Sequence, residues 1–377
     1  MNTFDATTEM VGKLTALKKE MFDLLQDPMF DAISYTKLQQ LEAKLQSGAF
    51  GKIGPVFFGN DLKNVRSVGV GRRYDYLPEG FFSAPTFNPP ADSVFILTNN
   101  DIGSTLPSYV DFYKNNPQTL FVIWDWDSQH WTYMSSMVGM YSDFYISGGS
   151  ENAYFLSHFN PNVLGPVFGG AYQWTREFIL ENIDSVMVER SNDPLGVHCF
   201  YANYPRRNRA IASVMKAFPS VRFGNNDYKK RTDLENFQEW CGHKTHWVMP
   251  VLGGLPLRGY NAMITGGIPV LPSYLKNFPE VSILGDLPLY YEVADLIDPV
   301  AIQEAAIKKF DSFGKGGLVQ RVLDGLEKYH VDARCEHILK LVESGVAKVR
   351  VADRSYSGGY YGMGSFSGRP GAGSATF

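Results

Sequence analysis

The sequence predicts an α/β protein with two domains, each built on a parallel β-sheet between helices. Its 377 residues are more than a single hydrophobic core usually accommodates. Short apolar segments alternate with segments of helical periodicity, which is the pattern of parallel sheets. Residues 246–275 are typical of a strand, a glycine-rich loop, a helix and a second strand in direct succession.

Residues 1–50 are predicted to form a helical extension before the first domain. Apolar residues recur there at helical spacing, as in Leu14, Leu17 and Met21 and again in Leu38. An amphipathic stripe of this kind serves either as a hairpin packed on the protein or as a contact between protomers. A homo-oligomer formed through these helices is therefore one expectation.

The first domain is expected over residues 51–175. Apolar runs typical of buried strands lie at residues 56–58, 65–70, 94–98 and 120–124. A helix is expected at 107–115, and the alternation of strands and helices predicts a parallel sheet. The proline- and glycine-rich segment 160–174 has the character of a linker or of a cleft wall.

The second domain is expected over residues 190–330, where a strand starting at Gly196, a helix and another strand form a βαβ unit. Further helices are expected at residues 234–242, 298–310, 318–329 and 333–344. Residues 331–353 are expected to form a terminal helix that packs on the rest of the protein. The tail, 354–377, is rich in Gly and Ser with interleaved aromatic residues, a composition that predicts flexibility.

The composition limits the classes of function. At 44% hydrophobic and 20% charged residues the chain resembles ordinary soluble proteins. A net charge of −4 argues against a large nonspecific nucleic-acid interface. Cys199, Cys241 and Cys335 are widely spaced, which suits a reducing compartment. No apolar run reaches the roughly 18 residues of a membrane span, and the first residues lack signal-peptide features, so the expected location is the cytoplasm.

The loop within residues 246–275 carries the chemistry of a phosphate site. Gly253 and Gly254 let the backbone approach a ligand closely. Arg258 stands where the helix is expected to start, and a helix N-terminus offers N–H groups and a partial positive charge to an anion. This arrangement predicts a site for a nucleotide diphosphate. Glycine-rich loops of many doubly wound folds bind nothing, so the loop alone leaves both interpretations open.

Residues 261–270, Asn-Ala-Met-Ile-Thr-Gly-Gly-Ile-Pro-Val, resemble the donor-site segment of glycosyltransferases of the two-domain GT-B fold. The resemblance implies two Rossmann-like domains facing a central cleft and a nucleotide-sugar donor, with a UDP-sugar expected, bound without a metal. The paired glutamates of many members would fall on Gly253 and Asn261, although Asn261 can still hydrogen-bond hydroxyls. Pro256 and Arg258 look more like the exostosin-type and fucosyltransferase-type variants of the loop.

Three arginines, Arg206, Arg207 and Arg209, stand at the expected start of another helix, where the helix dipole disfavours cations unless an anion binds. Arg206 and Arg209 share one helix face at i, i+3 spacing and are the preferred pair. A solvated basic first turn is the alternative. The predicted donor-binding residues are Arg258, Arg206, Arg209, Lys244, Gly254, Gly259, Tyr260 and Asn261.

In the first domain, a buried strand is followed by polar residues among tryptophans. Asp125, Asp127 and His130 are candidates for the base that deprotonates an acceptor hydroxyl, because open α/β sheets bind ligands at the carboxyl ends of strands. Trp126 and Trp131 offer flat faces to an acceptor. Alternatively, Asp127 caps a helix and the tryptophans only pack.

Three weaker signals accompany these candidates. Asp143 and His158 are expected to be structural rather than catalytic. A Gly-x-Gly within residues 68–73 is either a loop that closes over the donor or a simple turn.

The resulting hypothesis is a cytoplasmic hexosyl- or pentosyltransferase that uses a nucleotide-sugar. Its acceptor is a glycan, a small molecule, or 5-hydroxymethylpyrimidine in DNA, as in phage DNA glycosyltransferases. A non-catalytic nucleotide-binding or assembly protein is the alternative from another class. A sugar-nucleotide epimerase shares the fold, but no clear set of catalytic carboxylates and histidines supports it.

Overall fold

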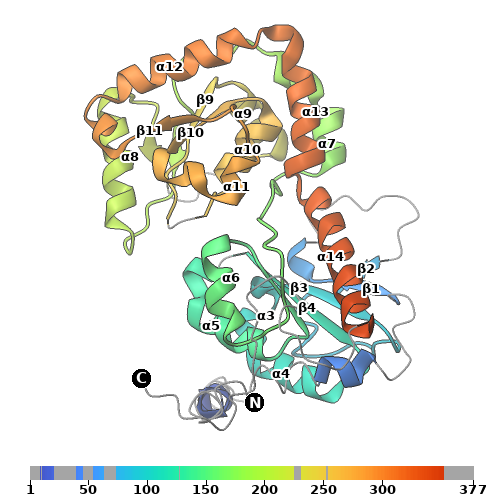
Figure 1. Cartoon of the computed structure of the whole chain (residues 1–377). Coiled ribbons are helices and arrows are strands. Elements are labelled where there is room, and N and C mark those ends of the chain that lie inside the picture. Colours follow the sequence, from blue (N-terminus) through green and yellow to red (C-terminus); the bar gives the residue numbers. More distant parts are fainter. Residues whose placement is uncertain are drawn as a thin grey trace. The chain divides into compact units, whose positions relative to one another are not determined.

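The computed structural model of the chain (Figure 1) describes residues 9, 11–20, 40–45, 54–62, 74–126, 128–224, 231–251 and 254–351. These residues form two compact units. Among them, residues up to 62, 74–167 and 337–351 belong to the first unit, and residues 168–336 belong to the second. Both units combine parallel strands with helices, so the predicted α/β class is confirmed.

The first unit contains a six-stranded parallel sheet of order β2-β1-β3-β4-β5-β6. The strands are β1 Val56–Phe58, β2 Tyr74–Tyr76, β3 Val94–Thr98, β4 Leu120–Asp125, β5 Phe144–Ser147 and β6 Val163–Leu164. Every residue of β3 and β4 is buried. Strands covered on both faces require continuous apolar runs, which explains why the sequence identified them. The strand expected at 65–70 lies outside the described residues.

Helices and short turns connect these strands. They are η1 Asn60–Leu62, α3 Asn99–Ile102, η2 Gly103–Thr105, α4 Leu106–Asn115, α5 Ser128–Met140 and α6 Ser150–Ser157. A capping box starts α3: the Thr98 hydroxyl accepts from the Asp101 N–H, and the Asp101 carboxylate accepts from the Thr98 N–H. Much of the aromatic content lies in the core, where the Phe81 ring contacts those of Phe95 and Phe112.

The order of strands in the first sheet reverses at β1. Val56 of β1 pairs with Tyr74 of β2 on one side and with Val94 of β3 on the other. Strand β2 therefore lies on one side of β1, and the chain then returns to the other side of β1, where β3 to β6 follow in order. Connections diverge at such a point, so a crevice forms beyond the carboxyl ends of the strands.

The second unit repeats this arrangement with shorter strands. They are β7 Val197–His198, β8 Arg222–Phe223, β9 Thr245–Trp247, β10 Ile268–Pro272 and β11 Leu289–Tyr291. The β8–β7 ladder and the β9–β10–β11 ladder are both parallel. The Leu195 N–H donates to the Thr245 carbonyl at 3.0 Å, so the segment entering β7 adjoins β9. The strand order therefore reverses at β7.

Helices cover both faces of these two ladders. They are α7 Arg176–Glu181, η3 Ile183–Met187, α8 Pro205–Ala217, α9 Asp233–Cys241, α10 Leu257–Thr265, η5 Ser273–Asn277, α11 Pro279–Ser282, η6 Val293–Ile297, α12 Pro299–Ser312, η7 Lys315–Gly317 and α13 Leu318–Tyr329. Trp247 packs with Ile211 of α8, whereas its neighbour Val248 packs with Ile264 of α10. Successive residues of a strand point to opposite faces, so α8 and α10 lie on opposite sides of the sheet.

The last described helix, α14 Val331–Val351, contributes to both units. From His337 onward it belongs to the first unit. A Cβ at Gly345 would lie 3.0 Å from the Phe144 ring and 3.4 Å from Leu164, so this part of α14 packs closely on β5 and β6.

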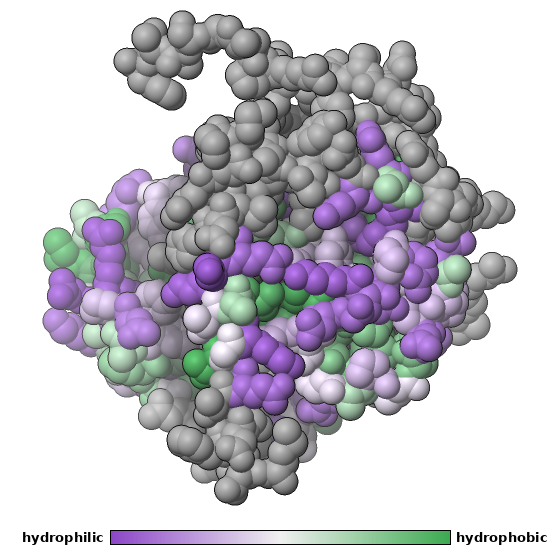
Figure 2. Space-filling view, turned by 90° about the horizontal axis from the view of Figure 1, so that it is seen from below, coloured by the Kyte–Doolittle hydropathy of each residue, from purple (hydrophilic) through white to green (hydrophobic). Residues whose placement is uncertain are grey.

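The face of the molecule shown in Figure 2 is mixed in polarity. In the view of Figure 2, hydrophilic residues cover much of the described surface, with hydrophobic residues in small groups between them. None of the described helices combines the length and the hydropathy that crossing a membrane requires.

Residues 40–45, helical as expected, dock on the first unit through a buried ion pair. Lys44 Nζ donates to Asp143 Oδ1 at 2.8 Å, to Oδ2 at 2.7 Å and to the Thr119 carbonyl at 2.7 Å. The Phe121 N–H donates to Asp143 Oδ2 at 2.7 Å. The side chains of Lys44 and Asp143 are only 7% and 1% exposed. These bonds use all three donors of the ammonium group, so Asp143 acts in packing.

Because removal of Lys44 leaves a buried carboxylate without its counter-charge, Lys44→Met is expected to lower the free energy of unfolding by about 3–5 kcal/mol. Lys114→Met is the matched control, since Lys114 forms an ion pair with Glu20 whose two side chains are 47% and 44% exposed. That change is expected to cost less than about 1 kcal/mol. Denaturant unfolding measures both. Equal losses in the two variants would contradict the structural role of the buried pair.

Candidate functional site

The candidate site of the second unit is formed by two loops at the reversal of strand order. Residues 199–204 follow β7 and lead into α8, and residues 248–256 follow β9 and lead into α10. The helices then run along opposite faces of the sheet, which is the arrangement that opens a ligand crevice at the carboxyl ends of strands. Residues 252–253, including Gly253, lie outside the described residues.

Arg258 lies in the first turn of α10 and is anchored to the strand β7. Its Nη1 donates to the Leu195 carbonyl at 3.4 Å, and its Nη2 donates to the Val197 carbonyl. The guanidinium carbon lies 5.3 Å from the centre of the Trp240 ring. The Leu195 N–H pairs with β9, and the carbonyl of a strand residue points the same way as its N–H. The Leu195 carbonyl that Arg258 contacts therefore faces β9, so Arg258 lies in the gap where β7 and β9 separate.

Arg207, in the first turn of α8, connects the two loops. Its Nε donates to the Met249 carbonyl at 2.9 Å, and its Nη1 donates to the Cys199 carbonyl at 2.7 Å. The guanidinium also lies 4.9 Å from the centre of the Tyr201 ring. No acceptor within the described part of the chain pairs with Nη2. A partly exposed guanidinium with free donors at a strand end is suited to an anion.

Arg206 and Arg209, the preferred pair in the sequence analysis, are exposed. Arg207 was not preferred because helix periodicity cannot show that the preceding loop curls back on α8. Asn208 holds that loop: its Nδ2 donates to the Tyr201 carbonyl at 2.6 Å, and its Oδ1 accepts from the Tyr201 N–H at 3.4 Å. The loop thereby brings its carbonyl groups toward Arg207.

His198, the last residue of β7, was missed by the sequence analysis. It is 3% exposed. Burial lowers its pKa well below the ordinary value, and the charges of Arg258 and Arg207 lower the pKa further. The imidazole is therefore neutral at physiological pH. Its place at the end of a strand, one short loop before a helix that starts with several arginines, is the signal that could have identified it.

Lys244 requires a correction to the predicted donor site. It precedes β9, so it lies at the amino end of a strand whose carboxyl end faces the crevice. Its Nζ forms an ion pair with Asp311 of α12 at 2.9 Å and lies 6.0 Å from the centre of the Phe310 ring. These contacts assign Lys244 to packing at the opposite end of the sheet.

The other residues predicted around the α10 N-terminus differ in accessibility. A Cβ at Gly254 would meet open space, whereas one at Gly259 would overlap the Leu255 side chain. Tyr260 and Asn261 are 2% and 0% exposed. Asn261 Nδ2 donates to Gln173 Oε1 at 2.6 Å, so its amide is enclosed by protein. Of these four residues, Gly254 borders the open side.

In the first unit, β4 extends through Asp125, which is completely buried and accepts a hydrogen bond from the Tyr145 hydroxyl. This corrects the expectation that Asp125 is an accessible base, because the carboxylate is enclosed in the sheet. The Trp126 N–H donates to Asn99 Oδ1 at 3.1 Å, and its ring stands edge-on to Trp124 at 4.8 Å.

The remaining first-domain candidates are only partly described. Asp127 lies outside the described residues, and so does the Gly-x-Gly segment 68–73. His130 and Trp131 belong to the first turn of α5, but their side chains are not among those described. His158 is exposed at the end of α6.

Comparison of the chain with models of protein families and with curated protein sequences finds no match. The function is therefore inferred from the fold and from the geometry of the site.

Because two main-chain carbonyls lose charged donors, Arg258→Ala is expected to lower the free energy of unfolding by about 2 kcal/mol or more. Arg209→Ala serves as a control, since Arg209 is exposed and its loss should cost less than about 0.5 kcal/mol. Denaturant unfolding of the two variants gives the comparison. If Arg258→Ala were as stable as Arg209→Ala, the anchoring of β7 by Arg258 would be excluded.

Proposed function

We propose that the protein is a glycosyltransferase of the GT-B fold, which transfers a sugar from a nucleotide-sugar to a hydroxyl acceptor. Two parallel α/β units, each with a reversal of strand order, support this fold. A last helix that belongs to both units supports it as well. The observation that carries the proposal is the convergence of Arg207, Arg258 and the α10 N-terminus beyond β7 and β9.

In this proposal the crevice holds the diphosphate of the donor. Arg207 Nη2 and the first N–H groups of α10 supply the direct contacts, and Arg258 contributes a fixed positive charge behind them. Main-chain carbonyls hold both guanidinium groups in place, so little reorganisation accompanies the departure of the diphosphate. Preorganised positive charge stabilises negative charge as it develops on the leaving group.

The donor is expected to be a UDP-sugar that needs no metal, and Asp127 or His130 is the proposed base for the acceptor hydroxyl. The three cysteines are free thiols, which suits a reducing compartment and supports the cytoplasm as the place of action.

Nucleotide binding is tested by thermal shift of the whole chain with UDP, UDP-sugars and other nucleoside diphosphates. A ligand at 100 times its Kd stabilises the folded state by about 2.7 kcal/mol. Arg207→Ala is expected to lose this stabilisation. Lys244→Ala, which removes a cation at the opposite end of β9, is expected to keep it. If no nucleoside diphosphate raised the melting temperature of the unmodified protein, the proposed function would be abandoned.

Sugar transfer is tested with the nucleotide-sugar that binds and a panel of acceptors, including a hydroxymethylated DNA duplex. Because Arg207 contacts the charge that develops on the leaving group, Arg207→Ala is expected to lower turnover by on the order of 10²-fold, while Lys244→Ala leaves it unchanged. Nucleotide binding without transfer or donor hydrolysis would favour the non-catalytic nucleotide-binding protein instead.

A further inference from the structure

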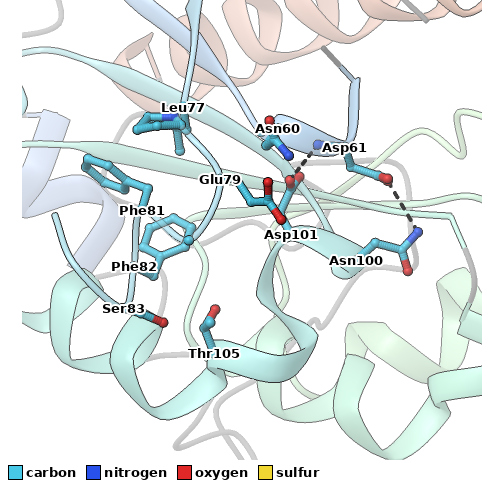
Figure 3. A pocket seen from close by; sticks show the side chains of 13 residues that line it. Asn60, Asp61, Leu77, Glu79, Phe81, Phe82, Ser83, Asn100, Asp101 and Thr105 are labelled. Atoms are coloured by element: carbon cyan, nitrogen blue, oxygen red, sulfur yellow. Dashed lines mark hydrogen bonds between the residues drawn. The ribbon is translucent and has the colours of Figure 1, made fainter. Parts of the chain in front are cut away.

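The first unit contains a hollow of about 440 Å³ beyond the carboxyl ends of β1, β2 and β3 (Figure 3). Its walls come from the three segments that follow these strands, residues 59–61, 77–83 and 100–105. The hollow therefore lies where the order of the first sheet reverses, the position at which open α/β sheets bind ligands. Its volume falls within the range of small-molecule sites, about 300–1,000 Å³.

The charge of this hollow is negative. Asp61, Glu79 and Asp101 line it, and the residues that line it within the described chain include no Lys, Arg or His. In Figure 3 the side chains of Glu79, Asp101 and Asn60 point into the same part of the hollow. Three carboxyl groups without a basic neighbour in the lining make this hollow complementary to a cation.

Two of the carboxylates are held rigidly. Asp101 accepts hydrogen bonds from the Asp61 N–H at 2.9 Å and from the Thr98 N–H at 2.8 Å. Asp61 Oδ2 accepts from the Thr98 hydroxyl at 2.9 Å and from Asn100 Nδ2 at 3.3 Å. A Cβ at position 59 would overlap the Asp101 carboxylate, so Gly59 permits this close approach. The negative charges are thus preorganised by the ends of β1 and β3.

Glu79 differs from these two residues because it is exposed. Among the described residues it has no hydrogen-bond or ion-pair partner. Its carboxylate is therefore available to a ligand, and its replacement should leave the packing of the first unit unchanged.

The pKa of Asp101 reflects its burial beside a second carboxylate. Burial raises its pKa to about 6; hydrogen bonds from Asp61 and Thr98 oppose the rise, and the charge of Asp61 adds to it. Among the described residues that line the hollow, the charged groups beside Asp101 are the carboxylates of Asp61 on η1 and Glu79 on the loop after β2. A cation placed among them would favour the ionised form of Asp101.

The rest of the lining distinguishes between kinds of cation. No set of three or more His, Cys, Asp or Glu side chains in the described chain is placed to hold a metal ion. The hollow instead offers the hydroxyl groups of Ser83 and Thr105, the amide of Asn60, and an apolar side at Leu77 and Phe82. Hydroxyl and amide groups pair with hydroxyl groups of a ligand.

We propose that this hollow binds a hydroxylated primary amine, whose ammonium group lies between Glu79 and Asp101 and whose hydroxyl groups face Asn60 and Thr105. This inference does not rest on the proposed transferase function, because it uses only the geometry of the first unit.

Calorimetric titration of the whole chain with glucamine, and with sorbitol, which carries a hydroxyl group in place of the ammonium, tests the proposal. Glucamine is expected to bind at least about tenfold more tightly than sorbitol, because it adds a charge-assisted contact. Equal affinities would overturn the proposal. Displacement of glucamine by magnesium chloride, but not by sodium chloride of equal ionic strength, would overturn it as well. Weaker binding of glucamine at pH 5 than at pH 7 is expected, because Asp101 takes up a proton in this range.

Variants locate the binding. Glu79→Gln is expected to weaken glucamine binding by about tenfold. Asp111→Asn is the matched control, since it removes an exposed carboxylate on α4 outside the lining, and it should leave the affinity unchanged. Unchanged binding in Glu79→Gln would overturn the proposal. Arg207→Ala is expected to bind glucamine normally, which separates this result from the nucleotide test.

Discussion

The handedness of parallel strand connections constrains the whole structure. Right-handed crossovers place a helix on one face of a sheet when the chain moves to one edge and on the other face when it moves to the opposite edge. In each unit the order in which strands are added reverses once, at β1 in the first unit and at β7 in the second. The loops on either side of each reversal diverge, so main-chain groups beyond the strand ends have no neighbouring strand to pair with. Side chains form hydrogen bonds with these groups instead. The candidate chemistry of both units lies at these two points.

The two reversals differ in charge. Beyond β7, Arg207 and Arg258 bring guanidinium groups to main-chain carbonyls that the sheet leaves unpaired. Beyond β1, Asp101 brings a carboxylate to main-chain N–H groups. In each case the charged side chain completes the hydrogen bonding of a strand end and also presents its charge to the crevice. The same topology thereby creates one place suited to anions and another suited to cations.

This double role connects stability with binding. A charge fixed by the main chain is already oriented when a ligand arrives, but its removal also breaks hydrogen bonds within the fold. Variants of Arg258 should therefore affect both properties, whereas Glu79, which has no partner among the described residues, should affect binding alone. The Lys44–Asp143 pair shows the other extreme, since its bonds are all internal and it is enclosed in the core.

The sequence by itself determined the α/β class and the buried strands, because strands covered on both faces must be apolar without interruption. It also identified α10 and its loop, since these features follow from residues adjacent in the chain. Only the tertiary structure decided that Arg207 connects the two loops, that Lys244 faces the opposite end of β9 and that Asp125 is enclosed. It alone assembled the acidic hollow from the three segments that follow β1, β2 and β3. Such positions depend on which distant segments meet at a strand end, and no local spacing of residues encodes that meeting.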